Sequence, residues 1–223
     1  MIPFTTEQFL RVFESYNETI YPVQWILVLM AMAAVLLSLK PSVRATRIIT
    51  VLLFALWCWS GVVYHWMFFS HINKAAYLFG LLFIIQAFLF LLLGFARGQP
   101  VFRARVSVAG VFGALLIIYA LLIYPVLSYS FGHRYPQSPT FGVPCPTTIL
   151  TFGLLLWLDH VPRFLMVIPL AWSLLGISAA ASLAISEDIG LVLAGLIGTI
   201  LILRRPLTLD SVETPIHRMR FKS

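Results

Sequence analysis

Residues 75–96 read AAYLFGLLFIIQAFLFLLLGFA, a stretch without a single charge and with one amide side chain, Gln86. A helix must hold about 20 mostly apolar residues to cross the roughly 30 Å hydrocarbon core of a bilayer. This stretch meets that requirement and ends abruptly at Arg97 and Gly98. It therefore predicts a membrane-spanning helix. The rest of the chain is accordingly interpreted as a protein surrounded by lipid.

The composition of the whole chain agrees with this prediction. Of its 223 residues, 61% are hydrophobic and only 10% are charged, and the mean hydropathy is +0.96. A soluble domain is about one-quarter charged, because water must wet its surface. A water-soluble globule is therefore excluded. Two cysteines are also too few for a disulfide framework.

Six further apolar stretches predict helices of the same kind. They cover about 21–39, 48–69, 106–129, 147–158, 164–185 and 189–203. The sequence thus predicts an all-α integral membrane protein with about seven transmembrane helices. Two of the stretches, 147–158 and 189–203, are short, so the distribution of charge is needed to decide the count.

Lys and Arg concentrate in cytoplasmic loops. With seven spans and the N-terminus outside, twelve of the fifteen basic residues lie on the inner side, and only Arg11, Lys74 and Arg134 lie outside. Leaving out one short span would place the basic tail outside. We therefore predict a cytoplasmic C-terminus and basic residues that contact anionic lipid headgroups. Nucleic acid is not an expected partner, although the net charge is +7.

Three regions follow from this topology. Residues 1–20 form an N-terminal amphipathic segment, residues 21–205 the seven-helix membrane domain, and residues 206–223 a basic cytoplasmic tail. Within the membrane domain, a Pro-rich outer loop spans residues 130–146, and its aromatic and apolar content predicts that it packs down as a cap.

The N-terminal segment carries a helix-start signal. Thr5 and Gln8 have the spacing of a capping box, and Phe9 and Phe13 recur at helical spacing after them. Two interpretations remain open. The segment is either a separate amphipathic helix on the outer membrane surface or a plain extension of the first span.

Polar side chains in or near a bilayer are costly, so they mark candidate sites. The predicted topology brings several of them to the outer face. The candidates for an ion or solute site are His65, Tyr64, Asn73, Cys145 and, within the third span, Gln86. For Gln86 an interhelical hydrogen bond is the alternative role.

Imidazole groups are common ligands of divalent metals. His65, His71 and His133 are therefore candidate ligands for a bound divalent ion, which is the only cofactor that the sequence suggests. The alternative for each is an amphipathic residue at the membrane interface, with its ring in lipid and a nitrogen in water.

Three functions are compatible with these features. The favoured one is a small permease or binding protein for an ion or solute. The second is a structural or accessory subunit of a larger complex, or a self-associating protein. Its motivation is a set of small residues that favour close helix contacts, at Gly176, Ala179, Ala180, Gly195 and Gly198. The third is a membrane-embedded metal-dependent hydrolase that uses the three histidines. Enzyme signatures such as a Gly-rich phosphate loop are absent, so an enzyme is less favoured.

Longer motifs carry a resemblance to known families. Pro3-Phe4-Thr5, Tyr64-His65 and the run PTFGVPCPTT at 139–148 resemble an uncharacterised family of bacterial multi-pass membrane proteins, domain of unknown function 6064. The resemblance implies a location in the bacterial inner (plasma) membrane and brings no activity with it. Ser60 and His65 also resemble a feature of membrane metallohydrolases related to alkaline ceramidase. The last span here lacks the paired histidines of that family.

Overall fold

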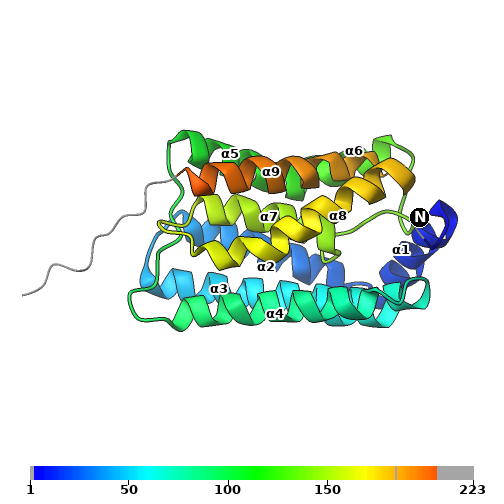
Figure 1. The fold of residues 1–223 in the computed structure, drawn as a ribbon, viewed down its shortest axis with the longest axis horizontal. Coiled ribbons are helices and arrows are strands. Elements are labelled where there is room, and N and C mark those ends of the chain that lie inside the picture. The colour runs from blue at the N-terminus through cyan, green and yellow to red at the C-terminus, as the bar shows by residue number, and fades with distance from the viewer. Residues whose placement is uncertain (1–2, 184, 205–223) are drawn as a thin grey trace, which may run out of the picture.

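A computed structural model describes residues 3–183 and 185–204, with the backbone alone for 178–181. Helices make up about three-quarters of this part of the chain, and its only β-structure is two isolated bridges. The all-α prediction is confirmed. Figure 1 shows the long helices lying side by side along one axis, with α1 at one end of the bundle.

The helices have the following bounds. They are α1 (Thr6–Ile20), α2 (Val23–Ser38), α3 (Val43–Trp59), η1 (Ser60–Phe68), η2 (Phe69–His71), α4 (Ala76–Phe95), α5 (Val108–Ile118), η3 (Tyr119–Ile123), α6 (Tyr124–Ser130), α7 (Pro144–Leu156), η4 (Arg163–Met166), α8 (Val167–Leu183), η5 (Ser186–Asp188) and α9 (Ile189–Leu203). Of these, η1 and η3 are π-helical, and η2, η4 and η5 are 3₁₀ turns. Each of the seven predicted apolar stretches is helical over most of its length.

The short helix α7 lies at the centre of the bundle, between α5, α8 and α9 (Figure 1). Every one of its residues except Cys145 is buried. It also begins at Pro144, earlier than predicted, because proline is well tolerated at the first position of a helix. Since α7 has no outward face, its neighbours rather than lipid surround it.

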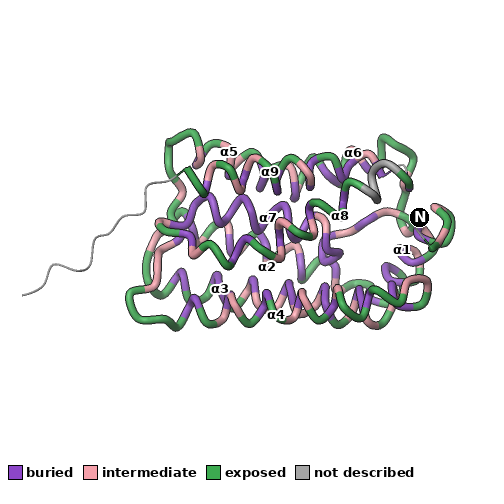
Figure 2. The backbone as a smooth tube through the Cα atoms, viewed as in Figure 1, coloured by how far each residue is buried: buried purple, intermediate pink, exposed green. Residues whose placement is uncertain are grey.

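The outer surface of the bundle is apolar. Leu92, Leu122 and Val108 expose 68%, 63% and 79% of their surface, and many other large aliphatic side chains do the same. Figure 2 shows such exposed positions along the outward sides of the long helices. Exposed apolar surface of this extent is unfavourable in water and is compatible with contact with lipid.

In the described part of the chain, four helices are long and apolar enough to cross a membrane. They are Val43–His71, Ala76–Phe95, Val108–Ser130 and Ser186–Leu203. The pair α1 and α2 passes the same test only when joined, with a bend of 90° between its parts. Length and composition thus support four or five spans. The predicted count of seven stays a prediction, because α7 and residues 163–177 are short of a full span.

The N-terminal helix is separate from the first apolar helix. Both hydrogen bonds of the predicted capping box are present between Thr5 and Gln8. The right-angle bend after Ile20 rules out a plain extension of α2. Helix α1 therefore lies across the end of the bundle, and its buried face includes Phe9, Phe13 and Tyr16.

Glycines allow helices inside the chain to pack closely. A methyl group on Gly113 of α5 would lie 2.8 Å from the backbone oxygen of Gly153 of α7. The small residues expected to contact other subunits also face neighbours within this chain. Gly176 faces Leu191, and Gly195 faces Ser173. Gly198 likewise faces Phe152. For Ala179 and Ala180 the structure describes only the backbone, so their side chains are not considered.

The Pro-rich loop packs down, as its composition predicts. Phe141 and Val143 are buried, and Ser60 of η1 donates a hydrogen bond to the backbone oxygen of Gly142 at 2.9 Å. The side chain of Asn17 in α1 also bonds this loop. Helix α1 and the loop together cover one end of the bundle.

Candidate functional site

Two π-helical segments lie near this covered end of the bundle. One is η1, which continues α3 and carries Tyr64 and His65. The other is η3, which lies between α5 and α6 and is followed by Pro125. Proline has no N–H and clashes with the carbonyl four residues earlier, which accounts for a change of hydrogen-bond register there. π-Helical turns are rare and are frequent at functional sites.

Two adjacent acidic residues lie beside the second of these segments. Glu187 and Asp188 form the short turn η5 that leads into α9, and they are 0% and 2% exposed. The hydroxyl of Tyr124 donates to Asp188 Oδ1 at 2.7 Å. The thiol of Cys145 donates to Asp188 Oδ2 at 3.5 Å. The Asp188 carboxylate therefore accepts a hydrogen bond on each of its oxygens.

The neighbouring carboxylate has a different environment. Glu187 Oε1 lies 3.0 Å from His133 Nδ1, which comes from the Pro-rich loop. Glu187 Oε2 is buried without a hydrogen-bond partner. The backbone oxygen of Glu187 accepts a bond of 2.7 Å from the hydroxyl of Tyr119. These contacts fix the turn between α8 and α9 against η3 and the loop.

No permanent cation neutralises the two acids within the part of the chain that the structure describes. At this end of the bundle, Arg11 pairs with Glu7. Lys74 and Arg134 instead lie over aromatic rings. A buried charge without a partner carries a large free-energy cost. In a chain with helices that could span a membrane, a buried acid of this kind is therefore a candidate functional group.

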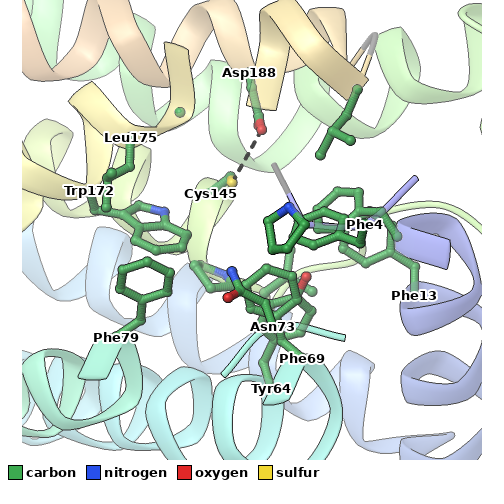
Figure 3. Close-up of a pocket in the computed structure, with 16 residues that line it drawn as sticks. Phe4, Phe13, Tyr64, Phe69, Asn73, Phe79, Cys145, Trp172, Leu175 and Asp188 are labelled. Carbon is green, nitrogen blue, oxygen red and sulfur yellow. Dashed lines mark hydrogen bonds between the residues drawn. The ribbon is translucent and has the colours of Figure 1, made fainter. Parts of the chain in front are cut away.

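A cavity of about 140 Å³ opens beside Asp188 and Cys145. Figure 3 shows these two residues at its upper side, Trp172 and Phe79 at the left, and Phe4 and Phe13 at the right. The remainder of the described wall is apolar apart from Tyr64 and Asn73. Seven aromatic rings line the cavity, those of Phe4, Phe9, Phe13, Tyr64, Phe69, Phe79 and Trp172.

A second, larger hollow of about 470 Å³ lies on the other side of the acidic turn. Tyr124 and His133 form part of its wall, so the residues that bond Asp188 and Glu187 separate the two spaces. Gln24 also borders it, with a buried Oε1 atom that has no hydrogen-bond partner.

The structure brings some of the residues proposed for an ion or solute site together and places others elsewhere. Tyr64, Asn73 and Cys145 line the 140 Å³ cavity together. Gln86 lies elsewhere: its Nε2 donates to the backbone oxygen of Leu165 at 3.2 Å, which is the interhelical bond of the alternative prediction.

The three histidines occupy three different environments. His65 is fully buried behind the cavity wall, 5.0 Å from the ring of Trp172, with both nitrogens unpaired. His71 Nδ1 lies 3.0 Å from the backbone oxygen of Phe68, and His133 contacts Glu187. Among the described residues, no three His, Cys, Asp or Glu side chains are grouped so that they could hold a metal ion. The expected gathering of histidines is therefore not present there.

The sequence prediction missed the acidic pair and its tyrosines. A usable signal was present, because Glu187 and Asp188 are the only acids between Asp159 and Asp210. The predicted spans 164–185 and 189–203 leave these two acids in the turn between them, and polar residues in such turns usually face water. Their burial depends on Tyr119 and Tyr124, which are more than sixty positions away in sequence.

These features define an all-helical protein with several helices able to span a membrane and a buried acidic pair at one end. The sequence matches the family of unknown function DUF6064 over residues 6–212, so the chain belongs to that family. A search of the curated proteins found no match, and a search of the solved structures found none either.

Proposed function

We propose that this protein is a permease of the bacterial inner membrane that binds a small monovalent cation beside Asp188. In this proposal the chain crosses the membrane seven times, with α1 and the acidic turn on the outer side and the tail in the cytoplasm. Lipids are its immediate partners. The alternation of helix direction along the bundle supports this layout (Figure 1). The basic loops at the end away from α1 support it as well.

One observation carries the proposal. Asp188 is 2% exposed, borders a cavity, and has no Lys or Arg partner among the described residues. A cation entering the cavity would supply the missing charge, and the low dielectric of the surroundings would strengthen the attraction. Tyr124 and Cys145 hold the carboxylate in a fixed orientation for this purpose.

The donor set favours a monovalent cation over a divalent metal. A structural or catalytic metal is held by three or four protein ligands. Asp188 is the only carboxylate among the described residues of the cavity wall, and no metal-binding group of three is present there. The single negative charge of one carboxylate balances the charge of one monovalent cation.

Uptake into proteoliposomes tests the proposal. The purified protein is reconstituted, and the uptake of sodium, rubidium and tetramethylammonium is measured against protein-free vesicles. We expect uptake of at least one of these cations, and a loss of more than about tenfold in Asp188→Asn, because the charge that binds the cation is gone.

Asp159→Asn is the matched control. Asp159 pairs with Arg103 and Arg105 at the opposite end of the bundle, so its loss should leave uptake unchanged. Equal uptake by wild type, Asp188→Asn and empty vesicles would overturn the permease. That result would leave an accessory subunit as the stronger candidate, although the glycines meant for such contacts pack inside this chain.

A further inference from the structure

We propose that the cation is organic, and specifically a small methylated ammonium of the size of tetramethylammonium. The inference rests on the proposed function for the presence of a cation beside Asp188. It adds the chemical class of that cation, and it is carried by the aromatic wall of the cavity rather than by the carboxylate alone.

The rings around the cavity form two contacting groups, which the ring of His65 bridges from behind. Tyr64 lies 5.9 Å from Phe69 and 6.1 Å from Phe13, measured between ring centroids. Phe79 lies 5.5 Å from Trp172. The faces of aromatic rings carry partial negative charge and attract cations within about 6 Å. A shell of rings closed by one carboxylate is the arrangement that recognises quaternary ammonium groups in proteins.

The rings come from distant parts of the sequence, and Phe9, Phe13, Tyr64 and Phe69 also belong to one buried packing cluster beside the cavity. Phe4 and Phe13 belong to the N-terminal region, Phe69 to η2, Phe79 to α4 and Trp172 to α8. Among the described residues, no side chain fills the space that they enclose. Figure 3 shows them around this space, with Asp188 above it.

The size of the cavity fits this class of ligand. Its volume of about 140 Å³ is close to the roughly 150 Å³ of an engineered apolar cavity that holds benzene. Tetramethylammonium has fewer heavy atoms than benzene. The cavity therefore accommodates the methylated head of a ligand.

The low polarity of the cavity wall favours an organic cation over a metal ion. An alkali ion must replace its water shell with several oxygens, and the described wall offers Asp188, Tyr64 and Asn73 among mostly apolar groups. Asn73 Oδ1 already accepts a bond from the backbone of Ala75. A methylated ammonium is weakly hydrated and needs no hydrogen-bond acceptors, so it loses little on entering a ring-lined space.

Isothermal titration calorimetry on the purified full-length protein tests the inference. The probes are tetramethylammonium chloride, potassium chloride and tert-butanol, which has nearly the same shape as tetramethylammonium without the charge. We expect saturable binding of tetramethylammonium only. Trp172→Leu should weaken it by roughly tenfold, because one of the aromatic rings that line the cavity is lost. Trp25→Leu, at a site 65% exposed and outside this cavity, should leave it unchanged.

The outcomes separate this inference from the proposed function. Potassium binding or sodium uptake that needs Asp188, without tetramethylammonium binding, would overturn the organic cation and retain the cation site. Binding of tert-butanol as tight as that of tetramethylammonium would show that the cavity is merely apolar. Should Asp188→Asn fail to fold, Trp172→Leu with unchanged affinity would by itself contradict the inference.

Discussion

Asn17 joins α1 to the Pro-rich loop through its whole side chain. Its Nδ2 donates to the backbone oxygens of Pro136 and Ser138, both at 2.7 Å, and its Oδ1 accepts from the Thr140 hydroxyl at 2.6 Å. The residue is fully buried. Buried polar groups of this kind are costly when one partner is removed, because the others stay desolvated. Asn17 therefore holds α1 across the end of the bundle and over the cavity.

Removing this side chain should loosen the covered end. We expect Asn17→Ala to lower the free energy of unfolding by about 2–3 kcal/mol, because two backbone oxygens and one hydroxyl lose their partner. Thermal unfolding in detergent, followed by tryptophan fluorescence, measures the effect. Gln137→Ala is the matched control, since its bond to Glu14 joins the same two segments but is exposed. Equal effects of both substitutions would contradict this role of Asn17.

At the scale of elements, close helix packing fixes the position of α7. Gly113 of α5 and Gly153 of α7 bring two backbones together near the middle of the bundle. Small residues permit such approaches in membrane proteins, where apolar burial alone drives little association between helices. The position of α7 decides where its first turn, with Cys145, meets Asp188.

A methyl group at this crossing should disturb the packing. In Gly113→Ala the new carbon would lie 2.8 Å from the Gly153 backbone oxygen, so the helices must move apart. We expect a loss of about 1–3 kcal/mol in stability, as for other overpacked cores. Gly176→Ala is the control, because the nearest atom there is the end of the flexible Leu191 side chain. Equal melting temperatures for wild type and Gly113→Ala would refute the contact.

The helices were predictable from the sequence and the site was only partly so. Long apolar runs fix helices by a local rule, and each predicted run is helical. The cavity depends on contacts between residues far apart, such as Asp188 with Tyr124. Tyr64, Asn73 and Cys145 were placed together through topology alone. His71 and Gln86 were proposed on polarity, which does not distinguish a site from a residue bonded to the nearest backbone oxygen.

At the scale of the whole molecule, the two ends of the bundle differ in chemistry. One end carries α1, the aromatic cavity and the buried acids. The other carries the exposed arginines, among them Arg103 and Arg105 with their partner Asp159. In the proposed orientation the second end faces the cytoplasm. The cavity then lies in the outer half of the bundle, on the side from which a permease would collect its cation.

Cys145 provides a native probe of this central claim, because it is a partly exposed residue whose thiol lies next to Asp188 in the cavity wall. In a Cys58→Ser background, intact cells are treated with a cationic trimethylammonium-ethyl methanethiosulfonate or with its anionic sulfonatoethyl analogue. We predict that Cys145 is modified from outside, faster by the cationic reagent, and that tetramethylammonium slows this reaction. Equal rates for the two reagents, or modification only in inside-out vesicles, would contradict a cation site in the outer half of the bundle.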